Sequence, residues 1–152
     1  MENISLSPIG FVKNSRKNME DDFWGDVISE ITIIDKLPED CLDGIEAFSH
    51  LEIIYYFNKS DKVLKGSAHP RENKSWPKVG IFAHRKKDRP NHIGTTIVEL
   101  ISRQGKTLLV RKLDADNDTP VLDIKPVVKE FLPEGKISQP SWITELMKDY
   151  WK

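Results

Sequence analysis

The chain has 152 residues, of which 38% are hydrophobic and 31% are charged, and its net charge is −1. This length predicts one compact domain spanning residues 1–152. The ordinary composition excludes a disordered, collagen-like or coiled-coil protein. Because the net charge is close to zero, the molecule as a whole has no positive field that would attract a polyanion. Any contact with nucleic acid therefore needs a local basic patch.

The sequence carries no signal for membrane insertion, secretion or disulfide formation. No apolar run approaches the roughly 20 residues of a membrane-spanning helix, and the stretch MENISLSPIGFVKNS does not look like a signal peptide. We therefore expect a cytoplasmic protein with no membrane contact. Cys41 is the single cysteine, which excludes an intramolecular disulfide and a zinc site built on two thiolates.

Seven short segments rich in β-branched and aromatic residues predict strands. In chain order they are residues 7–14, 27–35, 50–57, 78–83, 94–102, 106–113 and 120–126. The stretch RQGK around Gly105 is typical of a hairpin turn. No repeated strand-helix-strand spacing is present, so we expect a mainly β protein: a small antiparallel β-barrel with short peripheral helices and a C-terminal helix.

Two helices are predicted. Residues 38–45 begin with a proline at a first-turn position, followed by two acidic residues at the positive end of the helix dipole. Near the C-terminus, Ser141 is a candidate N-cap for residues 142–151. Three side chains there share one helical face, namely Trp142, Leu146 and Tyr150. That face packs either on the barrel or on another subunit, and the pattern is compatible with both.

Metal binding is disfavoured by the spacing of the candidate ligands. The four histidines, at positions 50, 69, 84 and 92, show no paired helical spacing. The acidic stretch DADNDTPVLDIK begins like a calcium loop, but it has Thr119 where glycine is required and Lys125 where a bidentate glutamate is required. We therefore expect no bound metal.

The basic stretch HRKKDRPNHIG, residues 84–94, is the strongest candidate for an anion contact. Pro90 fixes its own φ and pushes Arg89 toward extended geometry, and Asn91 tolerates unusual backbone conformations. The segment can therefore hold Arg85, Arg89 and Asn91 in fixed directions. A fixed guanidinium is suited to bidentate capture of a carboxylate or phosphate.

A second rigid element is the turn that precedes the last predicted strand. Asn117, Asp118 and Thr119 offer hydrogen-bond donors and acceptors immediately before Pro120. Such a turn can present polar groups to the edge of a ring or to ribose hydroxyls, although turns before strands commonly have this composition.

Three segments in this order, GIEAFSHLEIIYYF, GIFAHRKKDRPNHIGTTIVEL and LDADNDTPVLDIKP, resemble the TsaA-like family, which includes the TrmO-type tRNA methyltransferases. The resemblance covers roughly residues 6–128. It implies a small antiparallel barrel, usually a homodimer, that binds S-adenosylmethionine without a Rossmann-type fold. It also implies methylation of N6 of threonylcarbamoyladenosine at position 37 of tRNA, so tRNA and a second copy of the chain are the expected partners.

By this resemblance, Arg85 is the first choice for a contact with the cofactor. Further contacts are assigned to the end of the strand predicted at residues 50–57, to the RPN-x-IG segment and to the turn before Pro120. The assigned residues are Asn58, Lys59, Arg89, Asn91, Asn117, Asp118, Thr119 and Pro120. Phe23 and Trp24, aligned only through Gly25, are candidates for stacking on adenine or for facing the sulfonium.

The sequence departs from the family pattern in several places, including a more basic HRKKD stretch and an N-terminal loop replaced by MEDDFWGD. Asn117 and Asp118 replace the usual Asp-Gly of the turn, and His92 stands where proline is usual. Longer members carry a C-terminal domain that helps to hold tRNA, and this sequence predicts none.

The resemblance implies a reaction that needs a proton acceptor, for which Asp118, Asp123 and His92 are candidates. Two other functions stay open: a methyltransferase for a small metabolite, and a non-catalytic protein that binds S-adenosylmethionine.

Overall fold

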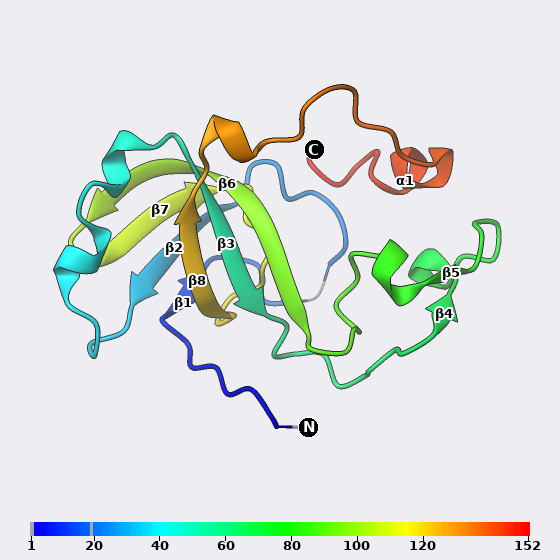
Figure 1. The fold of residues 1–152 in the computed structure, drawn as a ribbon, viewed down its shortest axis with the longest axis horizontal. Helices are drawn as coiled ribbons and strands as arrows, with labels where there is room; N and C mark the ends of the chain where they lie inside the picture. Colours follow the sequence, from blue (N-terminus) through cyan, green and yellow to red (C-terminus); the bar gives the residue numbers. More distant parts are fainter. Residues whose placement is uncertain (1, 19) are drawn as a thin grey trace.

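The computed structural model describes residues 2–18 and 20–152, which fold around a closed barrel of antiparallel strands (Figure 1). Around the barrel the strands run in the order β1 (Gly10–Lys13), β2 (Ile28–Ile33), β7 (Thr107–Arg111), β6 (Ile93–Gln104), β3 (His50–Tyr56) and β8 (Pro120–Pro126). The sequence prediction of a mainly β protein built on a small antiparallel barrel is confirmed.

Alternation of apolar and polar residues along the strands fills the interior of the barrel. Strand β2 alternates strictly between exposed and buried positions, and β3 buries every second residue. The fully buried side chains of the strands are Val12, Ile31, Leu51, Ile53, Val98, Leu108, Val110 and Val121. The interior is therefore a packed core, as expected for so few strands.

Strands β6 and β7 form the predicted hairpin. Gln104 pairs with Thr107, and Gly105 has a φ of 58°, in the left-handed region that glycine adopts without strain. The turn chemistry of RQGK thus determines where the chain reverses.

The barrel is closed by a short seam between β1 and β8. Two residue pairs join the strands, Gly10 with Val121 and Phe11 with Pro120. The contact continues into the preceding turn, because the Val12 amide donates to the Thr119 carbonyl (3.0 Å) and the Asp118 amide donates to the Val12 carbonyl (2.7 Å). The turn at residues 116–119 is therefore part of the barrel wall.

Residues 78–83, predicted as a barrel strand, lie outside the barrel. The two-residue strand β5 (Val79–Gly80) pairs with β4 (Ser67–Ala68), and the chain then enters the 3-10 turn η4 (Ile81–Ala83). Only Ile81 of this turn is buried, and Phe82 is 83% exposed. The segment pairs with β4 and with no strand of the barrel, and its apolar composition does not specify that partner.

The predicted helix at residues 38–45 is two 3-10 turns, η1 (Glu39–Leu42) and η2 (Ile45–Ala47). Gly44 lies between them with a φ of 86°, which interrupts any continuous helix. Two further 3-10 turns, η3 (Pro70–Glu72) and η5 (Lys129–Phe131), lie outside the barrel.

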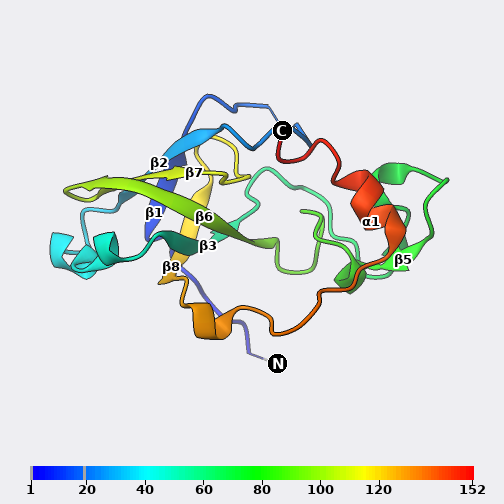
Figure 2. The ribbon, with the colours of Figure 1, turned by 90° about the horizontal axis from the view of Figure 1, so that it is seen from above.

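The C-terminal helix exists but is shorter than predicted. Helix α1 (Ser141–Leu146) begins after Pro140, and Ser141 is its first residue rather than its cap. The remaining residues continue as turns to the end of the chain. In both ribbon views α1 lies beside the β4 and β5 region, away from the β6–β7 hairpin (Figures 1 and 2). In the part of the chain that the structure describes, no helix has the length and apolar character needed to cross a membrane.

Candidate functional site

A cavity of about 1000 Å³ lies where the barrel meets the segments outside it. Strands β3 and β6 and residues 114–119 form its barrel side, and residues 57–60 and 82–89 form a second side. The C-terminal segment, residues 139–151, and residues 20–24 close it further. This volume is at the upper end of that of typical small-molecule sites.

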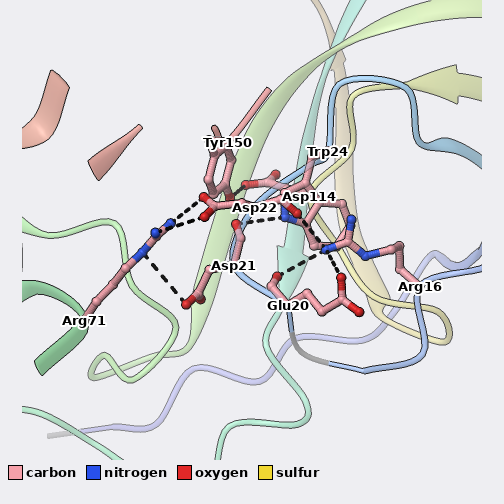
Figure 3. A network of polar contacts seen from close by, with 8 residues as sticks. All are labelled: Arg16, Glu20, Asp21, Asp22, Trp24, Arg71, Asp114 and Tyr150. Carbon is pink, nitrogen blue, oxygen red and sulfur yellow. Dashed lines mark hydrogen bonds and ion pairs between the residues drawn. The ribbon is translucent and has the colours of Figure 1, made fainter. Parts of the chain in front are cut away.

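Three hydroxyl groups converge on the carboxylate of Asp114 in this cavity. Thr96 and Tyr55 donate to Oδ1, the latter at 3.1 Å. Tyr150 donates to Oδ2, and Figure 3 shows this residue beside Asp114. The donors come from β6, β3 and the C-terminal segment, so one side chain connects three distant parts of the chain. A carboxylate has about four lone-pair positions, so one acceptor position remains for a ligand.

The two tyrosine hydroxyls stay protonated in this environment. Burial raises the pKa of the Tyr55 hydroxyl, and the nearby Asp114 carboxylate raises it further. The pKa of the Tyr150 hydroxyl is raised by the same two causes in the same order. Both hydroxyls therefore keep their protons at neutral pH, as hydrogen-bond donation to Asp114 requires.

Tyr55 lies opposite Gly94 in the β3–β6 pair. A Cβ atom on residue 94 would lie 2.6 Å from the Tyr55 ring and 2.8 Å from the Phe57 ring. The glycine of the RPN-x-IG motif therefore gives the Tyr55 ring the space that places its hydroxyl against Asp114. The requirement is one of volume, because Gly94 is not among the glycines with positive φ.

Arg16 organises the loop at residues 20–24. Its guanidinium donates to the carbonyl group of Phe23 (3.0 Å). It also donates to the carbonyl groups of Asp22 (3.0 Å) and Glu20 (3.4 Å) and lies 3.8 Å from the centre of the Trp24 ring (Figure 3). One face of Trp24 is thus already covered by a cation. The Arg16 guanidinium therefore fixes this wall of the cavity.

The C-terminal segment is attached to the same loop by backbone hydrogen bonds. The Trp24 amide donates to the Tyr150 carbonyl (2.8 Å), and the Phe23 amide donates to the Asp149 carbonyl (3.1 Å). A Cβ atom on Gly25 would lie 2.0 Å from the backbone oxygen of Trp151, so a glycine is needed there for the two segments to meet. These contacts hold Tyr150 over Asp114.

Several cations reach the cavity from segments outside the barrel core. Arg85 donates to the Thr95 carbonyl (2.7 Å), and Arg89 donates to the His84 carbonyl (2.9 Å). Lys59 lies 3.8 Å from the Asp116 carboxylate. Arg85 and Arg89 make these bonds to neutral carbonyls, so their charges are not neutralised by those contacts and can meet an anion.

Asp116 is the second aspartate in the cavity, with a side chain that is 11% exposed. Burial raises the pKa of its carboxyl group above the ordinary value, against the opposing effect of Lys59. A buried carboxylate with a raised pKa is a stronger base than an exposed one, which makes Asp116 suited to accept a proton.

Six of the eleven residues that the sequence assigned to the cofactor line the cavity. They are Trp24, Asn58, Lys59, Arg85, Arg89 and Thr119. Five do not line it: Phe23, Asn91, Asn117, Asp118 and Pro120. Phe23 is 58% exposed, and Asn117 instead accepts a hydrogen bond from the Asn14 amide (3.0 Å). The structure places these residues, and their roles in binding stay predictions.

The three residues proposed from sequence as proton acceptors do not line the cavity. Asp118 forms an exposed ion pair with Lys13. Asp123 lies on the outer side of β8, 3.0 Å from Lys125. The Nε2 atom of His92 lies 2.7 Å from the Lys62 carbonyl.

Asp114, Asp116 and Tyr150 are site residues that the sequence reasoning did not identify. The two aspartates stand in the stretch DADND, of which only Asn117 and Asp118 were predicted to belong to the site. Tyr150 was on the predicted apolar face of the C-terminal helix. Its contact with Asp114 depends on the path of the chain after α1, which no local pattern specifies. Within residues 2–18 and 20–152 no group of His, Cys, Asp and Glu side chains could hold a metal ion.

The solved structures that resemble this fold include a TrmO from Pseudomonas aeruginosa. The similarity has a TM-score of 0.69 and 24% identity, covering 89% of this chain and 61% of the solved chain. It supports the fold.

Two relatives carry names that describe a ligand or an activity. A probable S-adenosyl-L-methionine-binding protein of Methanothermobacter thermautotrophicus is 37% identical, over 84% of this chain and 92% of the relative. The human tRNA (adenine(37)-N6)-methyltransferase is 35% identical, over 68% of this chain and 23% of the relative. The chain thus spans nearly all of the first and under a quarter of the second.

The family described as the tRNA-methyltransferase O N-terminal domain matches residues 17–131. The match includes the barrel from β2 to β8 and every segment of the cavity except the C-terminal one. This chain therefore belongs to the tRNA-methyltransferase O N-terminal domain family.

Proposed function

We propose that this protein is a methyltransferase that transfers a methyl group from S-adenosylmethionine to N6 of adenosine 37 in tRNA, with threonylcarbamoyladenosine as the acceptor. The observation that carries the proposal is the cavity, whose volume of about 1000 Å³ is sufficient for a nucleoside cofactor together with an acceptor base. Family membership and the names of the relatives support the same assignment.

The cavity residues fit the chemical groups of S-adenosylmethionine. Its carboxylate requires a cation, which Arg85 and Lys59 can supply, and its ammonium and ribose hydroxyls require acceptors, which Asp114 can supply. The open acceptor position on Asp114 is suited to one such donor. Aromatic faces for the adenine or the sulfonium are available from Trp142.

S-adenosylmethionine supplies a methyl group activated by a positively charged sulfur. In the transfer, a bond would form between the methyl carbon and N6 of the acceptor. The bond between the methyl carbon and sulfur would break, and its electron pair would stay on sulfur. The proton on N6 must leave, and we assign its acceptance to a carboxylate oxygen of Asp116 because that carboxyl lies in the cavity and has a raised pKa. Asp118, Asp123 and His92 stay as predicted alternatives.

The rest of the chain contributes by positioning and by excluding water. The C-terminal segment and the loop at residues 20–24 cover the cavity, so the reacting groups would be held together in a partly dry site. No covalent intermediate on the protein is needed.

Calorimetric titration with S-adenosylmethionine, in parallel with Arg85→Ala, tests the cofactor assignment. We expect micromolar binding that the substitution weakens by about tenfold, because a charge-assisted contact is lost. Arg111→Ala is a matched control, since Arg111 pairs with Glu99 on the barrel and does not line the cavity. Absence of binding by the unaltered protein would refute the assignment.

Two alternative functions share this cofactor. A small-metabolite methyltransferase is compatible with the cavity, and a non-catalytic binder is favoured by the archaeal relative, which is named for binding alone. Labelled cofactor separates the three: methyl transfer to tRNA supports our proposal, transfer to a small-molecule extract supports the first alternative, and binding without transfer supports the second.

We also propose that the chain acts as one domain and forms a homodimer in the cytoplasm. Exposed apolar side chains on the outer face of β6 support the dimer: Ile93 and Ile97 are 37% and 48% exposed. Ile93 and Ile97 also line the cavity, so a second copy placed there would complete its wall. Light scattering of the purified protein at several concentrations tests the dimer.

A further inference from the structure

The near-zero net charge of the chain conceals a strong separation of charge. Residues 58–92 contain ten lysines and arginines and three carboxylates. The rest of the chain contains thirteen lysines and arginines and twenty-one carboxylates. One segment of the protein is therefore a basic region on an otherwise acidic molecule, and such a region produces a local positive potential.

This basic segment contains β4, β5 and η3 and stands out to one side of the barrel, beside α1 (Figures 1 and 2). A groove of about 500 Å³ runs along it. Four lysines line the groove: Lys62, Lys74, Lys78 and Lys86. The carboxylates in its lining are Glu72 and Asp88, and Asp88 also accepts a hydrogen bond from Ser60 (2.6 Å).

Three of the four groove lysines have no polar side-chain partner in the described part of the chain. Lys62, Lys74 and Lys78 are exposed, and in the described part of the chain none of the three side chains makes an ion pair or a hydrogen bond. Lysines that share one lining raise the local positive potential, which would attract an anionic partner to the groove.

The groove and the cavity share part of their walls. Lys86 and Asp88 line both, so a chain of phosphates lying in the groove would bring its neighbouring nucleotide to the cavity. Lysine recognises phosphate as a point charge and needs no fixed orientation of the ligand, which suits contacts along a backbone.

We infer that this groove, lined by Lys62, Lys74, Lys78 and Lys86, binds the phosphate backbone of the substrate RNA next to the nucleotide that enters the cavity. The inference rests on the proposed function for the identity of the RNA. It is independent of which residues hold the cofactor. A concave groove continuous with the site favours a polynucleotide strand over a membrane, which would need a broad surface with apolar anchors.

The test uses the triple variant Lys62→Ala, Lys74→Ala, Lys78→Ala, which leaves Lys86 in the cavity wall intact. The matched control is Lys36→Ala, Lys129→Ala, Lys136→Ala, in which three exposed lysines outside the groove are removed. Binding of a tRNA transcript is measured by fluorescence anisotropy between about 50 and 200 mM salt. Binding of S-adenosylmethionine is measured by calorimetry on the same samples.

We expect the groove variant to bind the transcript about tenfold more weakly than the unaltered protein at the lowest salt. The slope of log affinity against log salt should be smaller in magnitude by roughly 2 to 3 for this variant. The control variant should lose much less affinity, and both variants should bind the cofactor like the unaltered protein. In methyl-transfer assays the groove variant should raise KM for tRNA with little change in kcat.

Equal salt slopes for the groove variant and the control would overturn the inference while leaving the methyltransferase proposal intact. Lysine-dependent binding to vesicles of phosphatidylserine, without binding to RNA, would overturn it in favour of a membrane. Conversely, lysine-dependent RNA binding without methyl transfer would support the groove and refute the proposed activity.

Discussion

Tyr150, near the end of the chain, donates a hydrogen bond to the carboxylate of Asp114 in the cavity beside the barrel. Tyr150 lies beyond residues 17–131, where the family match ends, whereas Asp114 lies within them. A segment outside the family match thus contributes a donor to the buried carboxylate on which Tyr55 and Thr96 also converge. One side of the cavity in this protein is therefore formed by its own C-terminal segment.

Replacement of this tyrosine by phenylalanine tests the contact. Tyr150→Phe keeps the ring and removes the hydroxyl, so we expect the free energy of unfolding in urea to fall by about 1.5 kcal/mol, as for a hydrogen bond to a charged group. We also expect binding of S-adenosylmethionine to weaken, because the Tyr150 hydroxyl helps to hold the Asp114 carboxylate that lines the cavity.

Tyr56→Phe is the control for this experiment. Tyr56 lies on the outer face of β3 and is 40% exposed, so removal of its hydroxyl should change the free energy of unfolding by less than about 0.5 kcal/mol. If the two variants unfold at the same urea concentration and bind the cofactor alike, the Tyr150 hydroxyl has no special function.

The dependence of stability on pH should report the burial of Asp116. Burial raises the pKa of this carboxyl above its ordinary value of 3.8, so the fold favours the protonated form. The stability that this preference contributes is present below pH 3.8 and is lost as the pH rises through the folded-state pKa. We therefore expect Asp116→Asn to become progressively more stable than the unaltered protein as the pH rises, in urea unfolding from about pH 3 to about pH 6.

Asp118 provides a matched comparison of opposite sign. The hydrogen bond from Lys13 lowers the pKa of the Asp118 carboxyl, so its contribution to stability is present above pH 3.8 and is lost as the pH falls. Asp118→Asn should therefore become less stable than the unaltered protein as the pH rises. Parallel curves for the two variants would show that their environments do not differ as described.

Gly25→Ala tests the attachment of the C-terminal segment. Its new Cβ atom would meet backbone atoms of Trp151 at 2.0 and 2.7 Å, so one of the two backbones must move. We expect a loss of about 1 to 3 kcal/mol in unfolding free energy, as for overpacking. Faster hydrogen exchange of the Phe23 and Trp24 amides should accompany it, because those amides bond to Asp149 and Tyr150.

Gly66→Ala is the corresponding control. No atom lies within 4 Å of a Cβ built on Gly66, and its φ is not positive. The change should leave the exchange of the Phe23 and Trp24 amides as it is in the unaltered protein. If Gly25→Ala behaves in the same way, the C-terminal segment is not held in the way that the structure shows.

The barrel was predictable from sequence because its strands follow a local rule. Alternation in residues 28–33 and 50–56 directly reports which side chains face the interior, and Gly105 marks the hairpin. The segment at residues 78–83 has a similar composition but leaves Phe82 exposed. This segment pairs with β4 instead of a barrel strand, and composition does not determine the partner of a short apolar segment.

The cavity was only partly predictable, for a different reason. Arg85, Lys59 and Thr119 belong to motifs that resemble a known family, so their positions could be transferred. The contact between Asp114 and Tyr150 joins residues far apart in the sequence through the path of the chain after α1. Local patterns contain no information about such a path. They also do not predict the hydrogen bonds from the Arg16 guanidinium to the backbone of residues 20–24.

The seam between β1 and β8 links the folding of the barrel to its function. Thr119 holds Val12 at this seam and also lines the cavity, so an open barrel would have no complete site. A ligand that binds only the closed form stabilises it by mass action. S-adenosylmethionine should therefore raise the melting temperature and slow the local opening of the β1–β8 pairing. A thermal-shift measurement is thus a direct screen for ligands of the cavity.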